Sequence, residues 1–254
     1  MSLESVDDYL KGAFQKVQGW CIPHLWQAIQ PLRTAMAAEG PEGPIGEIGV
    51  YHGKFFIGLV KTMDAAAGNT AIDVFDLQRF NLDGAGEGNI EIFQRNLTLA
   101  GVPTAAVDTV RADSMSLDRT SMLRIHERTG GFSMFSIDGC HLVEHTVNDL
   151  SIAMELTRPN GIIFVDDYYN ANWPGVQEGV GRVFFAGAPR FVPLLFTCNK
   201  LFMCNISYHT EYLKLVAAFV RENHPTSRVK VVKRFGYETL TIVPVLTVEQ
   251  FVIR

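Results

Sequence analysis

Three aspartates and a histidine are the residues of this sequence best suited to chemistry. Asp138 and His141 stand in the run Phe-Ser-Ile-Asp-Gly-Cys-His, and Asp166 and Asp167 follow the apolar run Gly-Ile-Ile-Phe-Val. Acids that end buried strands converge at one edge of a parallel sheet. Three converging carboxylates repel one another unless a cation lies among them. The pattern therefore predicts a metal-assisted group-transfer site with Asp138, Asp166 and Asp167 as metal ligands.

Such a site would activate a hydroxyl group. An aliphatic hydroxyl holds its proton too tightly at neutral pH to be a good nucleophile. A hard divalent cation binds about six oxygen ligands, lowers the proton affinity of a bound hydroxyl and orients it. Imidazole, with an unperturbed pKa of about 6.5, is suited to take the remaining proton. His141 is therefore the expected base, with a pKa that neighbouring carboxylates raise and a divalent ion lowers.

A glycine-rich turn, Gly46-Glu-Ile-Gly-Val-Tyr-His-Gly53, is a second candidate site. Glycines allow close approach of a ligand, and Glu47 supplies a negative partner. The dinucleotide pattern G-x-G-x-x-G is absent, and no Gly-Lys-Ser/Thr phosphate loop is present, since Gly53-Lys54 is followed by Phe55. By itself the segment is equally consistent with a structural turn.

Acids also follow the second and third expected strands. Asp73 lies 24 residues after Gly49, near the roughly 20-residue offset at which an acid receives ribose hydroxyls in nucleotide-binding α/β folds. Asp76 competes for this role, and we favour Asp73 because it directly ends the apolar run. Asp113 and Ser114 follow the third strand. Each of these acids alone would also suit a turn or a helix cap.

The elements that must position these residues alternate along the chain. Helical residues 5–38 and a Gly/Pro-rich joint at 39–44 precede expected strands at residues 45–50, 70–75, 107–112, 132–137 and 161–165. Helices are expected at residues 54–66, 89–100, 116–128, 143–156 and 210–222, and hairpins at 191–206 and 228–243. Apolar strands need cover on both faces, which predicts an α/β fold with a doubly wound, mostly parallel, Rossmann-like sheet and an antiparallel C-terminal hairpin. The predicted division is an N-terminal helical segment (1–40), a core (41–207) and a C-terminal helix and hairpin extension (208–254).

Composition restricts the partners and the location. The 254 residues are 47% hydrophobic and 19% charged, enough for one large α/β domain. A net charge of −5 without a long Lys/Arg run argues against nucleic-acid binding. No apolar stretch approaches the roughly 20 residues of a membrane span, and the acidic N-terminus is unlike a signal peptide. The four cysteines (Cys21, Cys140, Cys198 and Cys204) lack Cys-x-x-Cys pairing and indicate free thiols in the cytoplasm.

Three segments of the sequence resemble a known enzyme family. They are the glycine-rich turn extended to Lys54, the run Ser-Ile-Asp-Gly-Cys-His and the run Arg-Pro-Asn-Gly-Ile-Ile-Phe-Val-Asp-Asp-Tyr. These segments are similar to class I S-adenosylmethionine-dependent methyltransferases, and in particular to metal-dependent O-methyltransferases that act on sugars of macrolide and related antibiotics. The resemblance extends over about residues 40–205. It implies the class I methyltransferase fold, S-adenosylmethionine as cofactor, and transfer to a hydroxyl of a small molecule such as a sugar or natural product.

Carried over position by position, the resemblance assigns roles to individual residues. In the subgroup, three acids after the fourth and fifth strands hold magnesium and a histidine three residues past the first acid is the base, which gives Asp138, Asp166, Asp167 and His141. The cofactor contacts that the resemblance and the strand ends together indicate are Glu47, Gly49, Gly53, Asp73, Asp76, Asp113, Ser114 and Asp138. Catechol-type enzymes carry lysine at the base position and asparagine at the third ligand, so a catechol substrate is not implied.

The surroundings of the acids suggest how an acceptor would be held. Tyr168, Tyr169 and Trp173 follow the paired acids and suit a ring-shaped acceptor, or else they form a packed cover over the sheet edge. The loop at residues 81–88 lies at the same rim and could act as a lid. The N-terminal helices and the C-terminal extension would shield the site or form a homo-oligomer interface.

Two other functions stay open at the level of the sequence. One is a metal-dependent hydroxylase on the same fold, which would need a redox metal or a reductant. The other is a non-catalytic binding subunit, although such a module has no need of a base beside the acids.

Overall fold

A nine-stranded sheet forms the centre of the computed structural model, which describes residues 5–40 and 42–243. Its strands are β1 (Ile45–Ile48), β2 (Asn69–Asp73), β3 (Val107–Arg111), β4 (Phe132–Ile137), β5 (Thr157–Val165), β6 (Phe191–Thr197), β7 (Lys200–Asn205), β8 (Arg228–Arg234) and β9 (Tyr237–Val243). Their order is β3-β2-β1-β4-β5-β7-β6-β9-β8. Strands β1 to β5 are parallel, and β7 is antiparallel to both β5 and β6. The predicted fold class is confirmed.

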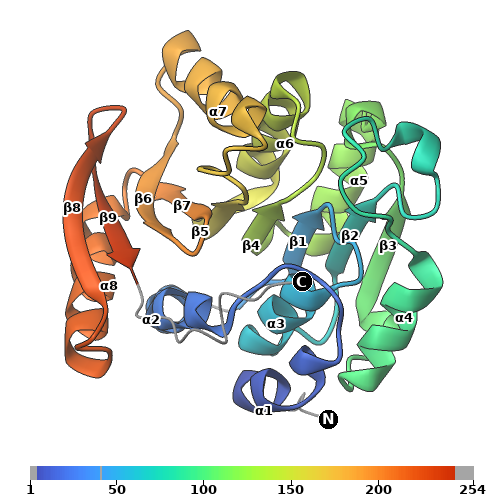
Figure 1. Ribbon diagram of the computed structural model, residues 1–254, viewed down its shortest axis with the longest axis horizontal. Coiled ribbons are helices and arrows are strands. Elements are labelled where there is room, and N and C mark those ends of the chain that lie inside the picture. The colour runs from blue at the N-terminus through green and yellow to red at the C-terminus, as the bar shows by residue number, and fades with distance from the viewer. Residues whose placement is uncertain (1–4, 41, 244–254) are drawn as a thin grey trace.

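Helices cover both faces of this sheet (Figure 1). They are α1 (Val6–Lys11), α2 (Trp26–Glu39), α3 (Lys54–Thr62), α4 (Ile90–Leu99), α5 (Arg119–Thr129), α6 (Val143–Leu156), α7 (Pro174–Ala186) and α8 (His209–Asn223). Short 3-10 turns are η1 (Ala13–Gln15), η2 (Pro23–Leu25), η3 (Gln78–Phe80), η4 (Thr104–Ala106) and η5 (Ser114–Ser116). One buried apolar cluster contains residues of α1 to α4 and α8, and a second contains residues of α5 to α7. Among the described residues, every helix is too short or too polar to cross a bilayer.

The turn between β1 and α3 is fixed by glycine. Gly49 has a φ of +81°, and a Cβ at this position would lie 1.9 Å from the carbonyl oxygen of Asp138. Gly53 has a φ of +88° and precedes the first residue of α3. Only a residue without a side chain allows the end of β1 to lie this close to the end of β4. This contact brings the glycine-rich turn and the first of the predicted catalytic acids together.

Several elements differ from the sequence expectation, among them two helices and a strand of the central sheet. Strand β5 begins at Thr157, and its register with β4 shifts between Phe132 and Met134. The early residues of β5 include Pro159, which lacks an N–H and is therefore tolerated at such an irregularity. Helix α5 begins after Asp118, whose side chain accepts a hydrogen bond from Ser121 N. Helix α7 was not among the expected elements.

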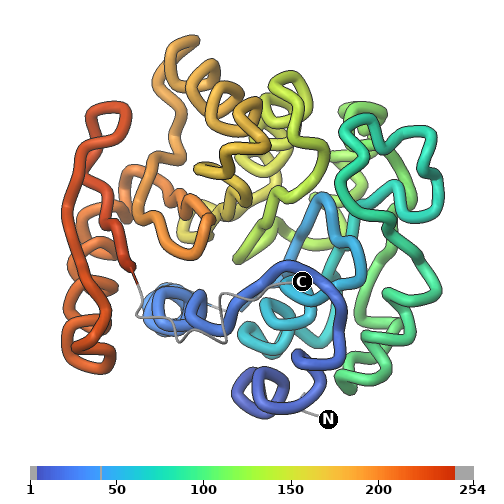
Figure 2. The backbone as a smooth tube through the Cα atoms, viewed as in Figure 1, coloured from blue at the N-terminus to red at the C-terminus, as the bar shows by residue number. Residues whose placement is uncertain are grey.

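The two ends of the described chain pack onto the same body. The expected N-terminal helix is broken into α1, η1, η2 and α2, and the link between η1 and α2 arcs over α3 (Figure 2). Strand β9 pairs in parallel with β6, so the hairpin of the C-terminal extension continues the central sheet. The part of the predicted extension after residue 243 lies outside the described residues. The four cysteines are unpaired, as predicted.

Candidate active site

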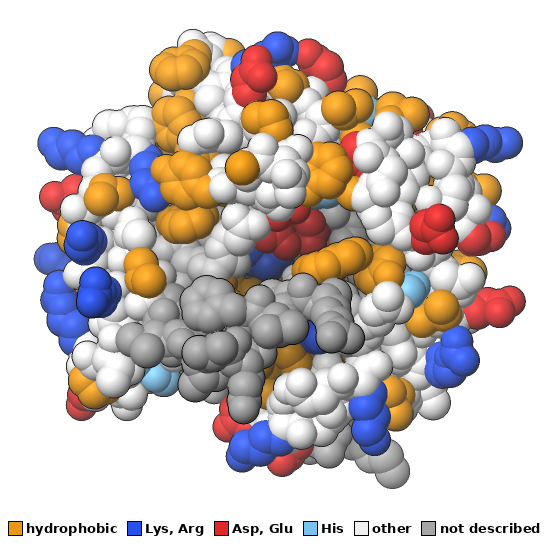
Figure 3. All heavy atoms as spheres, viewed as in Figure 1, with side chains coloured by type: hydrophobic (Ala, Val, Ile, Leu, Met, Phe, Trp, Pro, Cys, Tyr) orange, Lys and Arg blue, Asp and Glu red, His pale blue; other side chains and the backbone are white. Residues whose placement is uncertain are grey.

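A cavity of about 710 Å³ lies at the carboxyl ends of the parallel strands. It opens between β1 and β4, where the strand order reverses and where doubly wound folds bind ligands. Acidic side chains gather in a hollow at the middle of the face shown in Figure 3. The η1–α2 link also reaches the cavity, since Trp20, Cys21 and Ile22 line it. Its volume falls within the roughly 300–1,000 Å³ typical of small-molecule sites.

One end of the cavity contains the residues predicted for a cofactor after β1, β2 and β3. Gly49, Asp73, Asp113 and Ser114 line it. Asp73 accepts hydrogen bonds from Tyr51 N at 2.7 Å and from Phe75 N at 2.5 Å. Burial raises the pKa of Asp73 above its ordinary value, and these backbone hydrogen bonds oppose the rise without cancelling it. The carboxylate is therefore held in place beneath the glycine-rich turn, and each oxygen keeps a lone pair for a ligand.

Three predicted cofactor contacts do not line the cavity. Glu47 lies inside β1 with 2% of its surface exposed, and burial raises its pKa to about 8. A Cβ at Gly53 would lie 2.7 Å from the ring of Phe93, so this glycine serves helix packing. Asp76 forms an ion pair with Arg111, and both side chains are more than 40% exposed. In a strand, successive side chains point to opposite faces, and the sequence alone does not say which face Glu47 takes.

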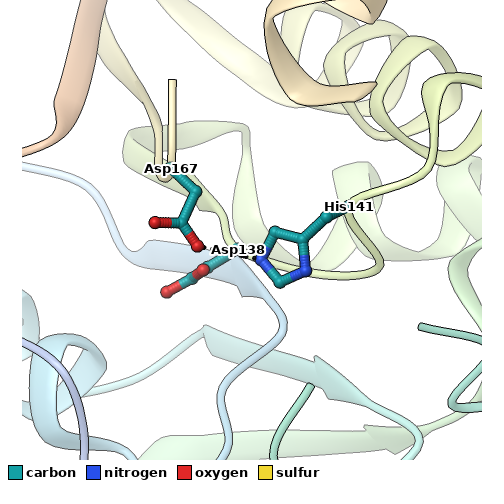
Figure 4. A group of neighbouring side chains, drawn as sticks. All are labelled: Asp138, His141 and Asp167. Carbon is teal, nitrogen blue, oxygen red and sulfur yellow. Dashed lines mark ion pairs between the residues drawn. The ribbon is translucent and has the colours of Figure 1, made fainter. Parts of the chain in front are cut away.

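The other end of the cavity contains Asp138, His141 and Asp167. One ligand atom from each lies within 4.8 Å of the others, and the three side chains point toward one another (Figure 4). Asp167 Oδ2 lies 3.1 Å from His141 Nε2. Its other oxygen accepts hydrogen bonds from the side-chain amides of Asn170 and Asn199, at 2.9 Å and 2.5 Å. Asp167 also has a φ of +54°, a strained conformation of the kind found at functional sites.

Asp83 lines the cavity and contacts His141, and the sequence reasoning did not assign it to the site. Its Oδ2 accepts hydrogen bonds from the backbone N and the ring Nδ1 of His141, both at 2.7 Å. The two side chains are only 4% and 9% exposed. The ring of Trp173 stacks on the imidazole with centroids 4.4 Å apart and planes 14° apart. Because Nδ1 faces Asp83, Nε2 is the nitrogen directed toward Asp138 and Asp167.

These contacts shift the pKa of each partner. Burial lowers the pKa of His141, but the hydrogen bonds to Asp167 and Asp83 outweigh it and raise the value to about 10. Burial raises the pKa of Asp83 and of Asp167, and the bond to His141 reverses this and lowers both. The signal in the sequence was an acid inside the loop 81–88, which was predicted as a lid and not as part of the catalytic group.

Asp166, the third predicted metal ligand, faces a different partner. Its Oδ1 accepts a hydrogen bond from Asp167 N at 2.8 Å, and its Oδ2 forms an ion pair with Lys200 Nζ. The same ammonium lies 3.8 Å from Asp138 Oδ2. Lys200 was not predicted from the sequence. Of the three predicted ligands, the structure therefore brings Asp138 and Asp167 together with His141, while Asp166 contacts Lys200.

The aromatic residues after the paired acids divide into two sets. Tyr168 is 3% exposed, and Tyr169 packs against it and against Phe196 with centroids 4.8 Å apart in each case. Neither tyrosine lines the cavity, so both follow the alternative of a packed cover over the sheet. Trp173 lines the cavity and contacts His141.

The donor set at the catalytic end fits a small divalent cation. Two carboxylates and an imidazole nitrogen converge on one point, and hard cations prefer oxygen ligands. The four acids around this point (Asp83, Asp138, Asp166 and Asp167) carry four negative charges when ionised, against one positive charge on Lys200 and one on His141, whose raised pKa keeps the imidazole protonated. This leaves an excess of two negative charges, which a divalent ion would balance.

Comparisons with known proteins give a consistent result. The family model for a methyltransferase domain matches residues 47–168. The structure of the O-methyltransferase NovP is similar with a TM-score of 0.54 and 13% identity, covering 79% of this chain and 99% of that one. The structure of the MycE methyltransferase from the mycinamycin biosynthetic pathway, in complex with Mg, SAH and mycinamycin VI, is similar with a TM-score of 0.52 and 18% identity, covering 80% of this chain and 55% of that one. No curated protein shows significant similarity to the sequence.

Proposed function

We propose that this chain, a class I methyltransferase by its fold and by the methyltransferase domain at residues 47–168, transfers a methyl group from S-adenosylmethionine to a hydroxyl of a small molecule. One observation carries the proposal: a single cavity contains the cofactor-type residues Gly49 and Asp73 at one end and the Asp138–His141–Asp167 group at the other. A cofactor at the first end would present its methyl group to an acceptor at the second. A sugar or natural-product hydroxyl suits the polar groups there.

The residues at the cofactor end have distinct tasks. Gly49 allows a ligand to approach the backbone, because a side chain would have no room at this position. Asp73 is fixed by two backbone hydrogen bonds and still has lone pairs that can accept from ribose hydroxyls. S-adenosylmethionine, when bound, supplies a methyl group that the sulfonium makes intrinsically transferable.

His141 is the proposed base. Its Nε2 would take the proton of the acceptor hydroxyl as the oxygen of that hydroxyl accepts the methyl group that S-adenosylmethionine supplies. Asp83 holds the Nδ1–H and so leaves Nε2 free to accept, and Trp173 fixes the plane of the ring. Positive charge that enters the cavity with the cofactor lowers the pKa of His141 from its raised value.

A divalent ion, magnesium by the resemblance, belongs to the proposal as well. Asp138 and Asp167 would hold it. Such an ion supplies a charge that lowers the proton affinity of the acceptor hydroxyl. Location in the cytoplasm and assembly into a homo-oligomer stay predictions from the sequence.

Two measurements test this function. Isothermal titration with S-adenosylhomocysteine should show binding to the wild type, and absence of binding would remove the cofactor assignment. Transfer of labelled methyl from S-adenosylmethionine to a panel of hydroxylated sugars and macrolides should identify an acceptor. His141→Ala should then abolish turnover and keep cofactor binding, and unchanged turnover would show that another group is the base.

The same assay addresses the hydroxylase alternative. The iron site of many such enzymes uses two histidines and one carboxylate, whereas the group described here has one histidine and two carboxylates. Turnover that requires iron and oxygen, and not S-adenosylmethionine, would favour the hydroxylase. Cofactor binding without any turnover of the panel would favour a binding subunit.

A further inference from the structure

The register of the sheet places Lys200 beside Asp166 and Asp138. Strands β5 and β7 are antiparallel, and Val165 is opposite Leu201. One step further along this register, Lys200 is opposite Asp166. The turn before β7 consists of Cys198 and Asn199, with φ values of +50° and +69°, and it ends where Lys200 begins the strand. The position of this lysine is therefore set by strand pairing.

The ammonium of Lys200 is buried and has several partners. The side chain is 2% exposed, and Nζ contacts Asp166 Oδ2 and lies 3.8 Å from Asp138 Oδ2. The ammonium also lies over the ring of Phe55, 4.4 Å from its centroid. A buried charge is strongly destabilising unless it is paired. Lys200 is thus held in its charged form by two carboxylates and an aromatic face.

The carboxylates of Asp138 and Asp166 face the same ammonium. Neighbouring buried carboxylates repel each other unless a positive charge lies beside them, and Lys200 Nζ is placed beside both. The place between these two acids is the place at which the sequence predicted a divalent ion. The chain already supplies a cation there.

We propose that Lys200 is the resident cation of the Asp138–Asp166 pair and takes the place of a divalent ion between these two carboxylates. Divalent ions then bind this chain weakly, through Asp138 and Asp167, and they are not needed to hold the acids together. The inference deepens the proposed function and rests on it only for the identity of the cofactor.

The test measures binding of Mn²⁺, a spectroscopically visible divalent ion, by electron paramagnetic resonance. The wild type should bind Mn²⁺ with a Kd in the millimolar range. Lys200→Met removes a positive charge that lies 3.8 Å from Asp138 Oδ2 and leaves Asp166 unpaired, so the affinity for Mn²⁺ should rise at least tenfold. Magnesium should also raise the Tm of Lys200→Met and leave that of the wild type unchanged.

A matched control comes from a second lysine over a phenylalanine ring. Lys54 Nζ lies 4.5 Å from the centroid of Phe14, as Lys200 lies over Phe55. Lys54→Met should leave the Kd for Mn²⁺ within about threefold of the wild type, since Asp138 and Asp166 keep their lysine. If Lys200→Met fails to fold, the double variant Lys200→Met with Asp166→Asn removes both charges of the ion pair and should bind Mn²⁺ as weakly as the wild type.

Any one of three results would overturn the inference. The first is a micromolar Kd for Mn²⁺ in the wild type, the second is no gain of Mn²⁺ affinity in Lys200→Met, and the third is tight Mn²⁺ binding by the double variant. None of these measurements requires an acceptor or S-adenosylmethionine. Failure of S-adenosylhomocysteine to bind the wild type would therefore defeat the proposed function and leave the Lys200 comparison intact.

Discussion

Substitution of Asp83 by asparagine tests the catalytic geometry most directly. In the wild type, Asp83 Oδ2 accepts from His141 Nδ1 at 2.7 Å, so Nε2 is the nitrogen that becomes unprotonated once the charge of the bound cofactor lowers the raised pKa of His141. An asparagine can donate its amide N–H to Nδ1 and so favour the tautomer with the proton on Nε2. The base would then hold a proton at the atom that has to accept one.

The size of the effect follows from the burial of the pair. Both side chains are less than 10% exposed, so their hydrogen bond is a charge-assisted one with little solvent screening. Such a bond is worth about 1.5–3 kcal/mol, and unit charges about 4 Å apart at an effective dielectric constant of about 20 attract by about 4 kcal/mol. Loss of about 2–4 kcal/mol from the transition state, in which the imidazolium forms, corresponds to a fall in kcat of about 30- to 1,000-fold.

The assay is transfer of labelled methyl to the acceptor found in the panel screen. Asp83→Asn should lower kcat by this factor and leave the Kd for S-adenosylhomocysteine within about threefold of the wild type. Nitrogen NMR shifts of the His141 ring should report a change of tautomer, which a merely structural defect would not produce. A kcat within threefold of the wild type, or an unchanged tautomer, would refute the role assigned to Asp83.

Three further predictions concern the cofactor end and the core. Gly49→Ala places a Cβ 1.9 Å from a carbonyl oxygen of the adjacent strand end and should cost about 3 kcal/mol or more in urea unfolding. Gly187→Ala, which meets nothing within 4 Å, should change the free energy by less than about 0.5 kcal/mol. Asp73→Asn should weaken S-adenosylhomocysteine binding about tenfold by calorimetry because it replaces a charged acceptor with a neutral one, whereas an equal loss in Asp76→Asn would contradict the placement of that residue away from the cavity. The pKa of Glu47 is raised to about 8, so its contribution to stability is present below about pH 4.3 and is lost as the pH rises through 8, by up to about 5 kcal/mol. Glu47→Gln should therefore flatten the fall in unfolding free energy between pH 5 and pH 9, and an unchanged slope would show that Glu47 is not the group responsible.

The local pattern of apolar and acidic residues determined the parallel part of the sheet and the edge at which its cavity lies. Apolar runs ending in acids predicted the parallel strands, and the carboxyl ends of those strands do form one cavity with Gly49, Asp73 and Asp138 around it. This inference succeeds because a parallel sheet gathers the ends of its strands at one edge regardless of the details of packing. The helical layers on both faces and the two hairpins followed from the same reasoning, whereas the strand order came from the structure.

The tertiary structure alone decided which groups meet. Asp83 and His141 are 58 positions apart, and Lys200 and Asp166 are 34 positions apart. No local periodicity relates the members of either pair. Their contacts depend on the path of a loop and on the register of β5 with β7, both of which are set by packing across the whole sheet.

The dependence on distant contacts also explains why two residues predicted for the cavity lie elsewhere in the structure. Glu47 and Tyr168 were assigned to the cavity by their position next to the site motifs, and both are buried and do not line it. A one-residue step along an extended chain turns a side chain to the opposite face. Asp166 and Asp167, in the turn after β5, also direct adjacent carboxylates to different partners, Lys200 and His141 respectively. Neither direction could be predicted from the sequence, because the energy that selects a face comes from distant partners that only the folded chain brings near.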